Sequence, residues 1–118
     1  MFATTAAGAL LWAPSAHAAT DSSVSAQGTY EGCPSGYVCM YPNASWNGGV
    51  PEHKYYTYGV HKLYNEYGSR RIFNNQTGGA TERECKNSDG TNCGSKLLPW
   101  TYRDVDITPI NSIRLDPS

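Results

Sequence analysis

The chain contains the stretch Cys33-Pro-Ser-Gly-Tyr-Val-Cys-Met-Tyr41, which continues as Pro42-Asn-Ala-Ser-Trp46-Asn-Gly48. Tyr37, Cys39 and Tyr41 alternate with other residues, and this period of two is typical of a β-strand, so we predict a strand over 36–41. The turn-forming residues that follow end on a glycine, which can adopt backbone shapes closed to other residues. The sequence therefore predicts a strand and then a folded turn, with Tyr41 and Trp46 packed over the turn.

Turn-forming residues recur every few positions along the rest of the chain, and the segments between them are rich in tyrosine. Short aromatic segments of this kind favour strands over helices. Further strands are predicted at 54–58, 70–73, 81–86, 96–102 and 112–115. One segment differs, because Val60, Leu63, Tyr64 and Tyr67 have the spacing of one helical face, and there we predict a short helical turn. The predicted fold class is all-β.

Length and charge restrict the function classes. The chain has 118 residues, of which 16% are charged, and a formal net charge of −1. One domain fits this length, and the absence of a basic composition argues against a nucleic-acid partner. The sequence contains neither a Gly-x-Ser-x-Gly elbow nor a His-Glu-x-x-His motif, and its carboxylates are scattered. We expect a protein that is not an enzyme and has no catalytic residue.

The first twenty residues contain no Lys, Arg, Asp or Glu and are largely apolar up to Trp12. The triplet Ala16-His17-Ala18 then has the form of a signal-peptide cleavage site. We predict a signal peptide over 1–19, a flexible arm over 20–32 and one domain over 33–118. The alternative, a membrane anchor, is disfavoured because the apolar run is too short to span the hydrocarbon layer. The expected protein is secreted and extracellular, without membrane contact after cleavage.

Four cysteines follow in the expected secreted part: Cys33, Cys39, Cys85 and Cys93. An even count in a short exported chain indicates disulfides, and four cysteines allow three pairings. We favour the local pairs Cys33–Cys39 and Cys85–Cys93, because each encloses a turn-rich segment. The alternative, four thiolates around zinc, would need closer cysteine pairs and a reducing compartment.

A faint internal repeat suggests two related units. Cys39 precedes Gly48 by nine residues, and Cys85 precedes Gly94 by the same number. One unit could hardly bury an inner face alone, whereas two packed sheets can. We therefore expect a β-sandwich of two Greek-key units, held together only by their apolar inner faces. The expected inner residues are Val38, Ile72, Leu98, Ile110 and Ile113.

The spacing of Tyr41, Trp46 and Gly48 resembles the βγ-crystallin signature, in which an aromatic, four residues, an aromatic, one residue and a glycine form a folded hairpin. The segment Cys33–Tyr41 also resembles the start of the secreted bacterial βγ-crystallin-like peptidase inhibitors, and Asp106–Leu115 resembles their last strand. The likeness covers nearly all of the expected mature chain. The second unit departs from it, because asparagines stand where the signature has aromatics.

This resemblance implies a βγ-crystallin-like Greek-key sandwich that inhibits metalloproteinases, with an extracellular protease as its protein partner. A rigid loop would occupy the protease cleft, since a disulfide lowers the ordering cost of binding. We expect this loop at Lys86–Lys96 and the protein to be a monomer. The candidate contact residues are Lys86, Asn87, Ser88, Asp89 and Asn92. Two alternatives stay open: a secreted antimicrobial or killer toxin-like protein, and a calcium-binding structural module.

Calcium is the usual ligand of microbial βγ-crystallins, and two segments of this chain correspond to the family's calcium clamp. Asn65–Arg70 comes nearest, but Arg70 replaces the last serine and brings a positive charge. Ile107–Ser112 lacks the acidic pair. Because a calcium ion needs several oxygen ligands, we expect these residues to cap turns and expect no cofactor.

Two histidines raise the question of zinc. His53 and His61 have Glu52 and Glu66 near in sequence, yet no spacing fixes a third ligand. We expect solvated surface histidines and no metal site. The tyrosines between 55 and 67 offer a ligand-binding face for sugar or peptide, although we expect most of them to replace aliphatic residues in a small core.

Overall fold

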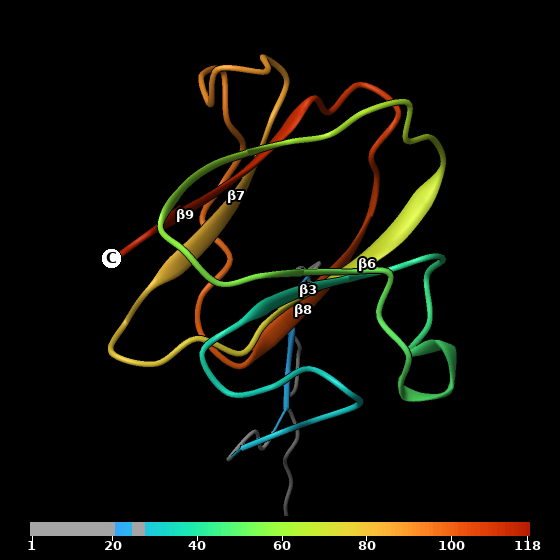
Figure 1. Cartoon of the computed structure of the whole chain (residues 1–118), viewed down its shortest axis with the longest axis vertical. Coiled ribbons are helices and arrows are strands. Elements are labelled where there is room, and N and C mark those ends of the chain that lie inside the picture. Colours follow the sequence, from blue (N-terminus) through green and yellow to red (C-terminus); the bar gives the residue numbers. More distant parts are fainter. Residues whose placement is uncertain (1–20, 25–27) are drawn as a thin grey trace, which may run out of the picture.

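The structure is a computed structural model that describes residues 21–24 and 28–118 (Figure 1). The described chain is all-β, as predicted, and its strands form two antiparallel sheets. The larger sheet has the order β2 (Asp21–Ser23), β8 (Thr101–Asp106), β6 (Ser69–Asn74), β3 (Val38–Tyr41) and β4 (His53–Tyr55). The smaller sheet has the order β5 (Gly59–Lys62), β9 (Ser112–Asp116) and β7 (Thr81–Cys85).

Helical structure among the described residues is limited to the 3-10 turn η3 (Asn47–Gly49). In this part of the chain, no helix has the length and apolar character needed to cross a membrane. The expected signal peptide over 1–19 lies outside the described residues.

The two halves of the chain exchange a strand. β5 belongs to the first half but pairs with β9 in the smaller sheet, whereas β8 belongs to the second half but pairs with β6 in the larger one. His61 lies opposite Ile113 in the first pairing, and Ile72 lies opposite Arg103 in the second. Backbone hydrogen bonds thus join the two halves within both sheets. The expectation that apolar faces alone hold the halves together is therefore wrong.

β3 defines the two faces of the larger sheet. Because neighbouring residues of a strand point to opposite faces, Val38 and Met40 enter the core between the sheets, while Cys39 and Tyr41 enter a second cluster. Tyr37 packs against that second cluster. The predicted common face of Tyr37, Cys39 and Tyr41 is confirmed, although the strand begins two residues later than predicted.

The core between the sheets is apolar. It consists of Val38, Met40, Leu63, Ile72, Leu97, Ile107, Ile113 and Leu115, with Tyr55, Val105 and Ile110 packed against it. Three expected inner residues, Val38, Ile72 and Ile113, are confirmed, and Ile110 lies at the margin. Leu98 is wrong, because 56% of its surface is exposed while Leu97 is buried. Two backbone hydrogen bonds to β7 fix this register, and an offset of one residue exchanges the buried and exposed faces.

The second cluster surrounds the indole ring of Trp46. Its centroid lies 5.3 Å from the ring of Tyr41, 5.4 Å from those of Phe73 and Tyr30, and 4.8 Å from that of Tyr102. All four contacts have the edge-on geometry that aromatic quadrupoles favour. The packing of Tyr41 against Trp46 is confirmed.

Two further features complete this cluster. The guanidinium of Arg71 lies 4.9 Å from the Trp46 ring and 4.4 Å from the Tyr102 ring, a cation–π arrangement. It also donates to Asp104 at 2.8 and 3.0 Å. Gly48 has a φ of 65°, which confirms the predicted left-handed backbone at the end of the turn.

The predicted helical turn over 60–67 is wrong, because this segment is β5 followed by a loop. Tyr64 and Tyr67 are exposed, so the apolar spacing does not mark one buried face. The predicted strand at 96–102 is also misplaced, since the strand runs over Thr101–Asp106. Three charged residues interrupt the apolar alternation of β8, and Arg103 is nevertheless buried through ion pairs.

The other strand predictions hold to different degrees. Those at 70–73, 81–86 and 112–115 are confirmed within one residue at each end by β6, β7 and β9. The one at 54–58 is too long, because β4 ends at Tyr55 and the chain then turns into β5.

The described part of the expected arm over 20–32 is structured. Asp21–Ser23 form β2, which pairs with β8 at the edge of the larger sheet. The guanidinium of Arg103 donates to both carboxylate oxygens of Asp21, at 3.0 and 3.2 Å. Tyr30 packs into the aromatic cluster. A flexible arm is therefore wrong for these described residues, while Thr20 and 25–27 lie outside them.

A pair of carboxyl groups lies inside the sandwich. Glu82 and Glu84 share one face of β7, and Glu82 is fully buried. Arg103 reaches across from the larger sheet and donates to Glu84 Oε1 at 2.9 Å. Among the described residues, neither oxygen of Glu82 has a hydrogen-bond donor. Burial, and then the charge of Glu84, raise the pKa of Glu82 well above its ordinary value. The buried carboxyl group of Glu82 therefore keeps its proton to a higher pH than an exposed glutamate does.

Trp46→Ala should lower the free energy of unfolding by about 3 kcal/mol or more, because four rings lose their common partner. The matched control is Trp100→Ala, since 45% of the Trp100 surface is exposed and its removal should cost about 1 kcal/mol or less. Urea unfolding of both variants measures the difference. Equal losses would contradict the central role of Trp46.

Glu82→Gln should raise stability at neutral pH. The native state retains a proton that the unfolded chain releases above its ordinary pKa of about 4.3. The native state then binds more protons, so stability falls as pH rises, by about 1.4 kcal/mol per pH unit, until the raised native pKa is reached. Glutamine has nearly the same shape as protonated glutamate and does not ionise. Thermal unfolding from acid to neutral pH should show a flatter profile for Glu82→Gln than for wild type or for the exposed control Glu31→Gln. Identical profiles would show that Glu82 is ionised in the native state.

Candidate functional site

The loop Lys86–Lys96 follows β7, and its first part projects beyond the end of that strand (Figure 1). Disulfides join Cys33 to Cys39 and Cys85 to Cys93, which confirms the favoured pairing. The second disulfide closes the base of the loop. The five candidate contact residues are all exposed: Lys86, Asn87, Ser88, Asp89 and Asn92.

Hydrogen bonds inside the loop hold its tip. The backbone N–H groups of Lys86 and Asn87 donate to the carbonyl oxygens of Asn92 and Thr91, at 3.0 and 3.2 Å. The Thr91 hydroxyl donates to Asp89 Oδ1 at 2.6 Å, and the Thr91 N–H donates to the same oxygen at 3.2 Å. The hydroxyl bond is the main cause of a lowered pKa of Asp89. The tip is thus a closed hairpin that carries an ionised carboxylate at neutral pH.

Side chains at the start of β9 tie this hairpin to the smaller sheet. Ser112 Oγ donates to the carbonyl of Asn87 at 2.6 Å, and Arg114 Nη1 donates to that of Gly90 at 3.1 Å. Asn111 Nδ2 donates to the carbonyl of the first loop residue at 2.8 Å. These supports lie 24 or 25 residues from the groups that they hold. Sequence reasoning missed them, because no local pattern connects β9 to the loop.

Gly90 allows the hairpin to lie against β5. Its φ is 82°, and a Cβ atom there would lie 2.4 Å from Cγ2 of Val60, far inside van der Waals contact. The Asp-Gly sequence at 89–90 indicates a turn, but only the tertiary approach of Val60 requires the missing side chain. Gly90 is therefore required for two reasons, its left-handed backbone and its close contact with Val60.

A hollow of about 280 Å³ lies beside the loop. Its lining residues are Glu84, Lys86, Asn92, Cys93, Gly94 and Ile110. Lys86 and Asn92 are exposed at its rim, whereas Glu84 is nearly buried. A concave surface with an apolar side and a few polar groups suits the side chain of a binding partner.

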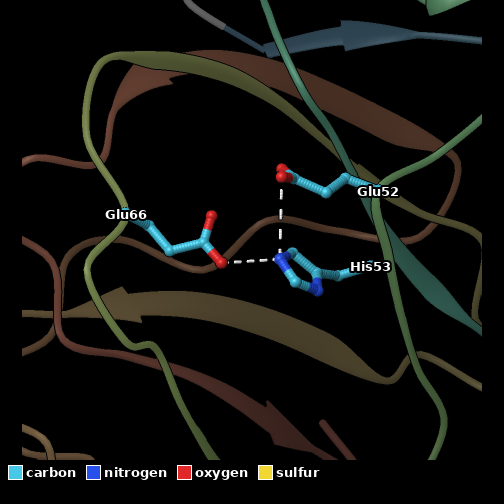
Figure 2. Close-up of side chains that lie close together, drawn as sticks. All are labelled: Glu52, His53 and Glu66. Atoms are coloured by element: carbon cyan, nitrogen blue, oxygen red, sulfur yellow. Dashed lines mark hydrogen bonds and ion pairs between the residues drawn. The ribbon is translucent and has the colours of Figure 1, made fainter.

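A second group of side chains comes together at Glu52, His53 and Glu66 (Figure 2). Glu52 precedes β4, His53 begins it, and Glu66 lies in the loop between β5 and β6. His53 Nε2 lies 2.6 Å from Glu66 Oε2 and 3.9 Å from Glu52 Oε1. His53 is therefore paired, and not solvated as expected. His61 does not join the group, because its Nε2 contacts the carbonyl of Thr57 at 2.8 Å.

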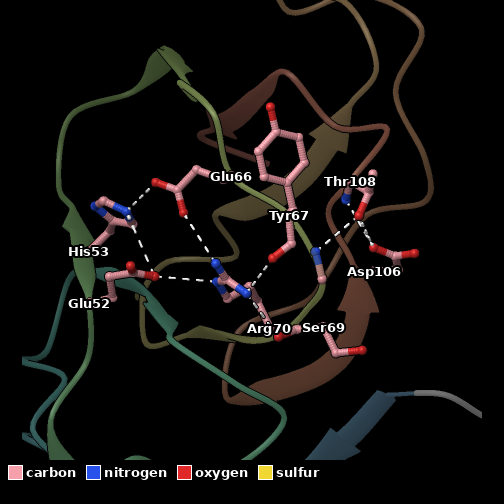
Figure 3. Close-up of polar contacts among 9 residues, drawn as sticks. Glu52, His53, Glu66, Tyr67, Ser69, Arg70, Asp106 and Thr108 are labelled. Atoms are coloured by element: carbon pink, nitrogen blue, oxygen red, sulfur yellow. Dashed lines mark hydrogen bonds and ion pairs between the residues drawn. The ribbon is translucent and has the colours of Figure 1, made fainter.

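Arg70 lies between the same two carboxylates (Figure 3). Its Nε lies 3.3 Å from Glu52 Oε1, and its Nη2 lies 3.8 Å from Glu66 Oε1. Its Nη1 donates to the carbonyls of Tyr67 and Ser69, at 2.7 and 3.2 Å. A fixed positive charge thus binds two backbone oxygens of Asn65–Arg70, the first segment that corresponds to the calcium clamp. This charge disfavours a calcium ion there.

Ile107–Ser112, the second segment that corresponds to the calcium clamp, contacts the first segment through Thr108 (Figure 3). Thr108 Oγ1 accepts from the N–H of Gly68 at 2.9 Å and donates to Asp106 Oδ1 at 2.7 Å. This second bond is the main cause of a lowered pKa of Asp106. These groups cap turns, as expected.

The tyrosines are divided between core and surface. Tyr55 packs against the core, but Tyr56, Tyr58, Tyr64 and Tyr67 are exposed. The expectation that most of them lie in the core is therefore wrong. Two of the exposed rings border a hollow of about 350 Å³, which is lined by Gly36, Tyr56, Thr57, Tyr58, Gln76 and Thr77.

Comparison with protein-family models, with curated proteins and with solved structures finds no match to this chain. Its function is therefore proposed from its own sequence and geometry.

Gly90→Ala should loosen the hairpin and cost about 1–3 kcal/mol of stability, because the new methyl group overlaps Val60 and the backbone is left-handed. Val60→Ala in the same chain removes the overlap and should recover part of the loss. Gly78→Ala is the control for the backbone effect alone, since Gly78 has a φ of 68° and open space around it. Thermal unfolding and amide hydrogen exchange at Asn87 measure the effect. Equal costs at Gly90 and Gly78 would show that contact with Val60 is unimportant.

Proposed function

We propose that this chain is a secreted inhibitor of extracellular peptidases, with metalloproteinases as the first target class, and that Lys86–Lys96 is its contact loop. The observation that carries the proposal is that the loop is exposed and at the same time ordered. Its polar side chains stand on a hairpin closed by Cys85–Cys93 and supported by β9. The two disulfides are consistent with an extracellular protein.

The proposed architecture is the βγ-crystallin-like pair of Greek keys. In the first half of the chain, β6, β3 and β4 lie side by side, and the third strand, β5, folds over to the other sheet. This order supports a Greek key with strand order 4-1-2-3. In the second half, β7 and β9 pair, and β8, which lies between them in sequence, crosses to the larger sheet. The aromatic turn around Trp46 lends further support.

An ordered loop can inhibit where a flexible one is cleaved. Binding a flexible segment costs about 0.5–1.5 kcal/mol for each side chain that becomes fixed. Hydrogen bonds inside this loop already restrict part of it before binding, so less order has to be imposed on it by the partner. If a peptidase cut the hairpin between Asn87 and Asn92, the Cys85–Cys93 disulfide and the bonds from β9 would hold both new ends in place. The cut chain would then remain in the cleft.

The contact loop is tested by Lys86→Ala combined with Ser88→Trp. Both positions are exposed, so the double variant should keep the melting temperature of wild type while its inhibition constant rises at least about tenfold. Lys54→Ala, an exposed lysine on β4, is the control and should inhibit like wild type. The assay uses a panel of extracellular peptidases that begins with a thermolysin-like metalloproteinase. A wild type that inhibits none of them at micromolar concentration would overturn the proposal.

The two disulfides give a second test. Replacing Cys85 and Cys93 by serine should weaken inhibition strongly while the circular dichroism of the strands is retained, because only the base of the loop is opened. Replacing Cys33 and Cys39, which are fully buried in the aromatic cluster, should lower stability by about 2–3 kcal/mol and leave inhibition intact below the melting temperature. The same loss of inhibition in both variants would mean that the contact surface lies elsewhere.

A further inference from the structure

We propose that Glu52, His53 and Glu66 form a binding site for one transition-metal ion of the zinc type. The proposal is independent of the contact loop and rests on the geometry of these three side chains (Figure 2). Each offers one ligand atom, and the three atoms lie within 4.8 Å of one another. No two of the ligands are fixed by a local motif, since Glu66 reaches the pair at 52–53 only because the loop before β6 folds back over β4.

The spacing of the ligand atoms fits a tetrahedral ion. Zinc bonds to imidazole nitrogen and carboxylate oxygen are about 2.0–2.2 Å long, so ligand atoms around the ion are roughly 3.4 Å apart. His53 Nε2 lies 2.6 Å from Glu66 Oε2 and 3.9 Å from Glu52 Oε1. The first distance would have to grow by about 0.8 Å and the second to shrink by about 0.5 Å, and small side-chain rotations can produce both changes. The side chains of Glu52 and His53 are 36% and 35% exposed, which leaves an open side for a water molecule as fourth ligand.

Arg70 contacts both carboxylates of the site, since its Nε donates to Glu52 Oε1 at 3.3 Å and its Nη2 lies 3.8 Å from Glu66 Oε1. At Glu52 an ion would share Oε1 with Arg70 or bind the other carboxylate oxygen. Glu66 uses Oε2 toward His53 and Oε1 toward Arg70 Nη2, so an ion at Oε2 leaves the arginine contact in place. Polar partners of the remaining oxygen commonly orient carboxylate ligands of metal ions, and the ion pair with Arg70 can act in this way on Glu66. With His53 neutral, the two carboxylates and Arg70 carry a net charge of −1, which favours a divalent cation.

The donor set selects the class of metal. Calcium requires six to eight oxygen ligands, which three side chains with one imidazole do not supply. One nitrogen and two carboxylate oxygens suit zinc and its neighbours in the first transition row. His61 offers a matched comparison, because it is a second partly exposed histidine whose Nε2 contacts the carbonyl of Thr57 and not a carboxylate of this group.

The test is calorimetric titration of the untagged, disulfide-bonded chain with zinc chloride. Wild type should bind one ion, and His53→Gln and Glu66→Gln should each weaken binding at least about tenfold. His61→Gln should bind like wild type, because His61 lies outside the group. On addition of zinc, the imidazole NMR signals of His53 should shift and those of His61 should not.

Several outcomes would overturn the site. They are the absence of zinc binding by wild type at submillimolar concentration, unchanged affinity in His53→Gln, or an equal loss in His61→Gln. Circular dichroism establishes that each variant is folded. If Glu66→Gln unfolds because it loses His53 and Arg70 together, Glu52→Gln replaces it, since Glu52 is the more exposed ligand. Since the readout is zinc affinity and not inhibition, the outcome does not depend on the proposed function.

Discussion

The apolar contact between the two sheets is the constraint on which the rest of this structure depends. A sheet with one apolar face must bury that face against another layer. Here Ile113 and Leu115 of the smaller sheet share one buried cluster with Val38, Met40 and Ile72 of the larger sheet. The exchange of β5 and β8 adds hydrogen bonds between the halves of the chain. Neither half can leave the other without breaking both sheets, so we expect the described domain to unfold as one unit.

Arg103 adds a polar link across the same contact. It binds Asp21 on the edge strand β2 and Glu84 in the opposite sheet. Buried ion pairs often add little net stability, because desolvation offsets their attraction. Their geometric demands are nevertheless strict, since removing one partner leaves a buried charge without compensation. The arrangement thus favours one register of β2 on β8 and one position of β7 relative to the larger sheet.

The sequence was sufficient for features that arise from local patterns. The alternation around Cys39, the turn at Trp46 and both disulfides are decided within a few residues of each other, and all are confirmed. Features that arise from long-range pairing were misjudged. The segment at 60–67 has helical spacing by coincidence, because β5 contributes an exposed Val60 and a loop contributes exposed tyrosines. The charged residues of β8 break the apolar alternation by which a strand is recognised in a sequence. Arg103 can be buried in this strand because it forms ion pairs with Asp21 and Glu84.

The two candidate sites differ in the same respect, because one is formed by residues close in sequence and the other by residues that are distant in sequence. The loop at Lys86–Lys96 could be predicted, because its disulfide and its turn residues are adjacent in sequence. The group of Glu52, His53 and Glu66 could not, since its members meet only when the loop before β6 returns to β4. Likewise, no pattern near the loop indicates Ser112 or Arg114, although both hold its backbone.

β9 explains how a small domain can keep such a loop ordered. It is the central strand of the smaller sheet, and its side chains alternate between two tasks. Ile113 and Leu115 point into the core, whereas Ser112 and Arg114 point away from it and bind the carbonyls of the hairpin. The loop is therefore anchored to a strand that is paired on both sides and contributes two buried residues to the core. A displacement of the hairpin relative to β9 would break the bonds from Ser112 and Arg114.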